Sequence, residues 1–103
     1  MDVLNKKIIT RTDLKVAGFS NLRFYKNRSV GKIFLDADYV LDVKASKYKV
    51  SITVEADDER TSHRSIQTLC RLMLIKLCEL KEMKVTELRK FAEDHGDKLD
   101  WAV

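Results

Sequence analysis

The chain has 103 residues, which is enough for one compact domain and too short for two. With 45% hydrophobic and 35% charged residues it can bury a core and stay soluble, and the lack of proline beside only three glycines excludes a linker or low-complexity segment. The net charge of +4 permits binding to phosphates or to an acidic partner without requiring either. We therefore expect residues 1–103 to form a single α+β domain.

The sequence favours a protein of the cytoplasm. Residues 1–13, MDVLNKKIITRTD, contain no apolar stretch that could serve as a secretory signal, and no segment approaches the roughly 20 apolar residues of a membrane span. Cys70 and Cys78 fall on one predicted helix and lie about 12 Å apart along its axis, which is too far for a disulfide. We expect two free thiols, a reducing compartment and no membrane partner.

The first expected elements precede residue 20. Residues 6–10, KKIIT, predict a short strand that would be the fourth of a sheet. Residues 12–19, TDLKVAGF, predict a short helix with Thr12 as its cap and Gly18 near its end.

Residues 21–26, NLRFYK, predict the first strand of an antiparallel sheet. Leu22 and Phe24 alternate with Arg23 and Tyr25, and a period of two is typical of a strand with one apolar face. Alternate side chains therefore divide between a core and an outer face.

The longest alternating stretch is residues 32–43, KIFLDADYVLDV, where the odd positions are apolar. In residues 48–55 the apolar side chains occupy even positions instead. A four-residue loop, 44–47, that pairs Val43 with Tyr48 would keep both apolar sets on one face of a hairpin.

This hairpin register also predicts contacts on the outer face. It places Asp42 opposite Lys49, which is a favourable cross-strand pair, and Asp36 opposite Glu55, which is unfavourable. Because the first of the two strands is long, we expect a bend or bulge near residues 37–39.

The first strand can join the same sheet. If Leu22 faces Leu35 and Phe24 faces Ile33, the connecting loop is residues 27–30, and the result is a meander with one apolar face. The sheet has three strands, or four if the N-terminal segment joins it.

Two helices are predicted after the sheet. One runs from Ser62 to about Met83, with an apolar stripe at Ile66, Leu69, Cys70, Met73, Leu74, Leu77 and Leu80. The second covers residues 86–96, with Thr86 as cap, Gly96 as stop and a stripe at Leu88, Phe91, Ala92 and His95. The fold class is therefore α+β, with a three- or four-stranded antiparallel meander and both C-terminal helices packed on one face.

Four apolar residues lie off these stripes or beyond them. Leu72 and Ile75 sit on the far side of the long helix, so either the last helix or a second subunit must cover them, and both alternatives stay open. In the tail, Leu99 and Trp101 are expected to fold back onto the domain.

The sequence offers little support for catalysis, a metal or a cofactor. The two histidines and two cysteines lack the spacing of a zinc site, and no phosphate-binding loop is present. Asp42-Val43-Lys44 has the acid-x-Lys form seen in magnesium-dependent nucleases, but the preceding strand supplies no acid to share the ion. We expect a non-enzymatic protein without a cofactor.

The outer face of the sheet offers a stronger hypothesis. Aromatic side chains interleaved with cations on an open sheet are typical of surfaces that stack bases and grip phosphates. The residues of this predicted site are Arg23, Tyr25, Lys26, Arg28, Lys32 and Phe34. The alternative is that the N-terminal segment or a second subunit covers Tyr25 and Phe34, and this alternative stays open.

Two functions remain open at this point. The predicted site binds single-stranded or structured nucleic acid, or the protein is an interaction module, such as an accessory or inhibitor protein, that binds another protein. In the second case the partner contacts the same face or the Leu72 and Ile75 patch, and a homodimer is one form of it.

Overall fold

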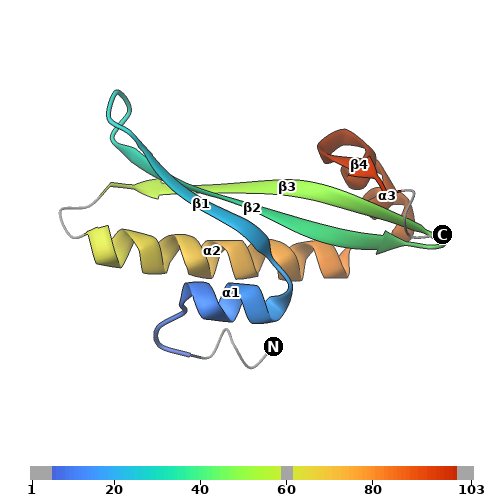
Figure 1. Cartoon of the computed structure of the whole chain (residues 1–103), viewed down its shortest axis with the longest axis horizontal. Helices are drawn as coiled ribbons and strands as arrows, with labels where there is room; N and C mark the ends of the chain where they lie inside the picture. Colours follow the sequence, from blue (N-terminus) through green and yellow to red (C-terminus); the bar gives the residue numbers. More distant parts are fainter. Residues whose placement is uncertain (1–5, 59–61, 100–103) are drawn as a thin grey trace.

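The computed structural model describes residues 6–58 and 62–99 (Figure 1). A four-stranded antiparallel sheet with the order β1-β2-β3-β4 forms a meander, and two C-terminal helices pack against it. This confirms the predicted α+β class. The elements are α1 (Arg11–Ala17), β1 (Ser20–Asn27), β2 (Lys32–Val43), β3 (Ser46–Asp57), α2 (Ser62–Glu82), α3 (Val85–His95) and β4 (Gly96–Lys98).

The alternation of apolar residues divides the sheet into two faces as expected. The inner face is buried at Ile33, Leu35, Ala37, Leu41, Val43, Tyr48, Val50 and Ile52. The polar residues between them lie on the other face, which α2 does not cover (Figure 1). Helix α2 runs along the inner face, and its buried side chains are Ser65, Leu69, Cys70, Met73, Leu74, Leu77 and Leu80. Burial of each large apolar side chain stabilises the fold by about 1.5–3 kcal/mol.

The predicted register of β2 and β3 is wrong by two residues. Val43 pairs with Ser46 rather than Tyr48, so the loop is a two-residue turn at Lys44 and Ala45. Lys44 has a φ of 56°, in the left-handed region that tight turns use. The shift keeps every side chain on its predicted face because it is an even number of residues.

The register of β1 and β2 is also shifted by two residues, because Phe24 pairs with Leu35 rather than with Ile33. The expected bulge lies in β1 instead of β2, between Ser20 and Arg23. At residues 37–39, where the bulge was expected, the β2–β3 ladder is continuous. At the observed bulge, Asn21 adopts the left-handed conformation with a φ of 53°.

The N-terminal predictions need correction. Residues 6–10 form no strand, and Ile9 is buried in the core. Thr10, not Thr12, caps α1 in a reciprocal capping box with Asp13. Gly18 ends α1 in the left-handed conformation, as expected.

The fourth strand comes instead from the C-terminal tail. Helix α3 ends at Gly96, as predicted, and β4 then pairs with Tyr48–Val50 of β3. The predicted cap at Thr86 is wrong, because the N-cap residue is Lys84, which makes no side-chain capping hydrogen bond. The amide of Leu99 donates to the carbonyl of Lys47, so the tail does fold back, whereas Trp101 lies outside the described residues.

Neither Cys70 nor Cys78 forms a disulfide, as the helix spacing predicts. Burial raises the pKa of the Cys70 thiol and keeps it protonated at neutral pH. Among the described residues, no helix combines the length and the apolar character needed to cross a membrane.

Candidate functional site

All six residues of the predicted site belong to one hairpin, formed by β1 and β2. Arg23, Tyr25, Lys32 and Phe34 share the outer face, whereas Lys26 points to the opposite face and Arg28 lies in the turn. The tip of this hairpin rises away from the helices (Figure 1). We call these six residues the hairpin site.

The aromatic pair of the hairpin site forms directly across the strands. Tyr25 pairs with Phe34 in the ladder, and their rings stack with centroids 5.1 Å apart and an interplanar angle of 10°. The guanidinium of Arg23 lies 5.4 Å from the Tyr25 ring centroid, which is close enough for a cation–π interaction. Tyr25 is 39% exposed and Phe34 is half-buried, so α2 does not cover either ring.

Two cations near the hairpin tip make ion pairs with β3 and the residues after it. The Lys32 ammonium lies 3.1 Å from a carboxylate oxygen of Glu55, and the Lys26 ammonium lies 3.7 Å from one of Asp58. Arg28 has no ion pair within the described residues. Exposed ion pairs contribute about 0–1 kcal/mol each, so a phosphate group can replace these carboxylates at small cost.

Further along β2, Asp36 is the centre of a hydrogen-bond network. Its carboxylate accepts from Arg23 at 2.7 Å, from the Thr53 hydroxyl at 2.7 Å and from the Tyr25 hydroxyl at 3.3 Å. Partial burial raises the pKa of Asp36, but these donors outweigh it and the net pKa lies below the ordinary value. Burial and the Asp36 charge raise the pKa of Tyr25.

Asp38, two residues further along β2 on the same face, has a similar environment. The Asn21 amide donates to its carboxylate at 2.8 Å and the Ser51 hydroxyl at 3.0 Å, and the Lys49 ammonium lies 3.6 Å away. The hydrogen bond from Asn21 is the largest cause of the lowered pKa of Asp38. Neighbouring side chains on the outer face therefore compensate the negative charges of Asp36 and Asp38.

Acidification is expected to destabilise the fold through these two carboxylates. Because the pKa values of Asp36 and Asp38 are lowered from 3.8 in the folded state, their stabilisation is complete above that pH and is lost as the pH falls towards the folded pKa values. Urea denaturation across the carboxylate titration range measures this slope. Asp38→Asn should make the free energy of unfolding depend less steeply on pH. Glu87→Gln, at an exposed position, should leave that dependence unchanged. Equal slopes in the two variants would show that the hydrogen bonds to Asp38 do not stabilise the fold.

The acid-x-Lys pattern does not assemble a metal site. Lys44 lies in the β2–β3 turn, and Asp42 lies 3.9 Å from the ammonium of Lys47, its neighbour across the strands. Within residues 6–58 and 62–99, no three His, Cys, Asp or Glu side chains are close enough to hold a metal ion. The Nδ1–H of His95 donates to the Phe91 carbonyl oxygen, 3.0 Å away, and the His95 ring stacks on the Phe91 ring.

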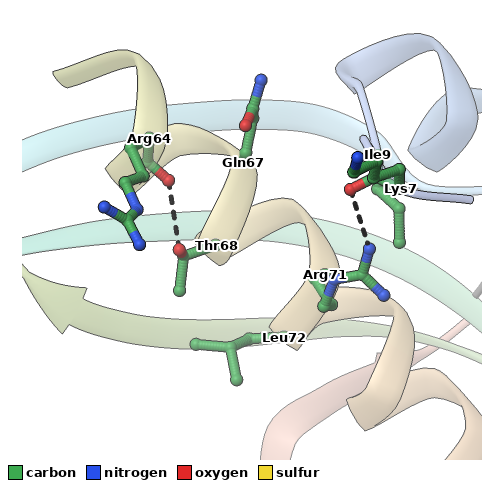
Figure 2. A pocket seen from close by; sticks show the side chains of 7 residues that line it. All are labelled: Lys7, Ile9, Arg64, Gln67, Thr68, Arg71 and Leu72. Atoms are coloured by element: carbon green, nitrogen blue, oxygen red, sulfur yellow. Dashed lines mark hydrogen bonds between the residues drawn. The ribbon is translucent and has the colours of Figure 1, made fainter. Parts of the chain in front are cut away.

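The structure adds a basic pocket that the sequence analysis missed. It lies between the N-terminal segment and α2, has a volume of about 230 Å³ and contains no acid among its described lining residues (Figure 2). Arg71 donates to the Lys6 and Lys7 carbonyls at 2.6 and 3.3 Å, and this contact holds the segment against the helix. The lining residues are Lys7, Ile9, Arg64, Gln67, Thr68, Arg71 and Leu72.

One sequence signal could have indicated this pocket. Arg64, Thr68 and Arg71 are spaced four and three residues apart, so they share one stripe of α2 on the side away from the core. The position of Lys7 beside that stripe depends on the tertiary fold, because more than fifty residues separate it from α2.

The predicted interface residues Leu72 and Ile75 lie beside β3. With Val54 they contribute the apolar part of a shallow surface depression of about 330 Å³ that includes no residue of α3. Ile75 is 38% exposed, so the alternative that the last helix covers it is wrong.

The hairpin site, the basic pocket and this depression are three candidate binding surfaces of the molecule. Comparisons with protein-family models, with curated proteins and with solved structures find no match to this chain. The fold and the surfaces of the molecule are therefore the basis for any functional proposal.

Proposed function

We propose that the protein binds nucleic acid and that the hairpin site makes the main contact. The observation that carries this proposal is the projecting hairpin, in which residues 22–35 contain four cations and no acid around the stacked Tyr25 and Phe34. A two-stranded ribbon of this kind has the dimensions to enter a groove or to lie along a single strand. The function is binding, without catalysis.

The electrostatics of the hairpin support contact with phosphates. Arg28 is available at the turn, and Lys32 can exchange Glu55 for a phosphate oxygen with little loss. Release of counterions from the nucleic acid then provides most of the binding free energy, which makes affinity depend steeply on salt.

The basic pocket is a second contact in this proposal. The N-terminal end of α2, which carries Arg64, and the hairpin tip lie towards the same end of the molecule (Figure 1). A phosphate backbone that passes the hairpin can therefore meet Lys7 and Arg64. Arg71 is a positioning residue, since its guanidinium holds the carbonyls of the N-terminal segment.

Charge reversal on the hairpin is expected to abolish most of the affinity for nucleic acid. Fluorescence anisotropy would follow binding of mixed-sequence single-stranded and duplex oligonucleotides across a salt series. The double variant Arg28→Glu/Lys32→Glu should bind about tenfold more weakly or worse, and the slope of log K against log salt should fall by about 1.4–1.8, the equivalent of two phosphate contacts.

A matched control separates a local effect from a change in net charge. Arg89→Glu/Lys90→Glu makes the same charge change on the exposed face of α3 and should bind much like the wild type. A further variant, Tyr25→Ala/Phe34→Ala, should weaken single-strand binding, since stacking contributes about 1–3 kcal/mol per base. Absence of binding by the wild type at low salt, or equal losses in the two charge variants, would overturn the proposal.

A further inference from the structure

One edge of the sheet is only partly covered. Strand β4 pairs with Tyr48–Val50, whereas β3 continues to Asp57. Because the Lys47 carbonyl faces β4, the peptide groups of the odd-numbered residues of β3 all face this edge. In the part of the chain that the structure describes, no strand pairs with Ser51–Asp57 on that side. At the two ends of this segment the Asp57 carbonyl accepts from the Ser65 hydroxyl at 3.4 Å, and the C-terminal end of α3 lies beside Ser51, so the most open peptide groups are those of Thr53 and Glu55.

An apolar patch lies directly beside this open edge. Val54 from β3 and Leu72 and Ile75 from α2 line the same shallow depression. Its polar rim includes Lys76 and Glu79, which lie 3.7 Å apart in an ion pair. We call Val54, Leu72 and Ile75 the edge patch. Open peptide groups thus occur together with an exposed apolar side chain, Ile75, and two half-buried ones, Val54 and Leu72.

The open part of β3 has few of the features that usually prevent strand addition, its only charged side chains being Glu55 and Asp57. Edge strands are commonly protected by proline, lysine or a bulge. Strand β1, at the other edge, has a bulge after Ser20 and carries Arg23 and Lys26. Residues 51–57, SITVEAD, contain no proline and no lysine, and their ladder with β2 has no irregularity.

We propose that this edge binds a second copy of the chain, so that two β3 strands pair antiparallel about a two-fold axis at Val54. This register places Ser51 of each copy opposite Asp57 of the other and Thr53 opposite Glu55, so no like charges are directly opposed. The two sheets join into one, and the edge patches meet beside the axis.

Self-complementarity is what favours a second copy over an unrelated partner. A two-fold interface requires that a surface match itself, and the segment offers both backbone donors and acceptors, hydroxyl groups opposite carboxylates, and an apolar residue at its centre. Leu72 also lines the basic pocket and Glu55 pairs with Lys32, but Val54 and Ile75 belong to neither the hairpin site nor the basic pocket. A change at Ile75 can therefore abolish the dimer without removing a proposed contact to nucleic acid.

Sedimentation equilibrium or light scattering tests this proposal. The wild type should show twice the chain mass of 12.0 kDa, with a concentration-dependent shift to monomer. Ile75→Lys, at an exposed position, should yield a monomer at all concentrations, whereas Val16→Lys, at an 81% exposed site on α1, should leave the dimer unchanged.

A second variant tests strand pairing itself. Glu55→Pro removes an N–H that faces the open edge and is not used by β2, so it should keep the chain folded and abolish the dimer. Circular dichroism checks the fold of each variant. A wild type that is monomeric up to millimolar concentration overturns the proposal, as does a dimer that survives either Ile75→Lys or Glu55→Pro. In the monomeric case, the edge is left to an extended segment of another protein.

Discussion

Replacing Leu74 with alanine is expected to lower the free energy of unfolding by about 2–5 kcal/mol. Leu74 lies in the middle of α2, is fully buried and belongs to the cluster that joins the helix to the inner face of the sheet. The change removes apolar contacts and leaves a cavity that the neighbouring side chains fill only in part. Urea denaturation measures the loss directly.

The control for this prediction is an exposed apolar residue on another helix. Val16, on α1, is 81% exposed, so Val16→Ala should change the free energy of unfolding by no more than about 0.5 kcal/mol. A similarly small effect for Leu74→Ala would mean that α2 does not cover the sheet in solution.

Replacing Gly96 with alanine is expected to detach β4 from β3 and to cost about 1–3 kcal/mol of stability. A Cβ atom at Gly96 would lie only 2.3 Å from the Lys49 carbonyl oxygen and 2.7 Å from a methyl group of Val50. The backbone φ of −154° is accessible to alanine, so the cost arises from this clash rather than from backbone strain. Amide hydrogen exchange should show lost protection at Leu99, which donates to Lys47.

Gly31→Ala is the matched control, because its loss of stability should come from backbone strain and not from a clash. Gly31 has a φ of 64°, and no atom lies within 4 Å of the position where a Cβ would stand. The substitution should cost about 1–2 kcal/mol through backbone strain and should leave exchange at the β3–β4 pair unchanged. If Gly96→Ala also leaves that exchange unchanged, the close approach of β4 is not maintained in solution.

The faces of the sheet and the long helix could be predicted from the sequence because they depend on local periodicity. The alternation in β2 and β3 and the stripe on α2 each repeat several times, so a single atypical residue does not disturb the assignment. Local periodicity also predicts which residues of the hairpin site lie on one face. Arg23, Tyr25, Lys32 and Phe34 share a face in any register that preserves their parity.

The details of that site could not be predicted, because they depend on which residues stand opposite one another. The expected register placed Tyr25 opposite Lys32, whereas the structure pairs it with Phe34 and places Arg23 opposite Asp36. The aromatic stack and the Asp36 network follow from this difference. The observed register also separates Asp36 from Glu55, and Thr53 takes the place opposite Asp36.

The amino-acid sequence by itself determined the parity of each strand, the position of α2 and the composition of each face, since these follow from local hydrophobic patterns. Only the tertiary structure decided the registers, the source of β4, the open edge of β3 and the meeting of Lys7 with α2. A shift of two residues leaves every side chain on its face, so the pattern cannot distinguish such registers. The turn at Lys44 and the packing of distant segments make that choice.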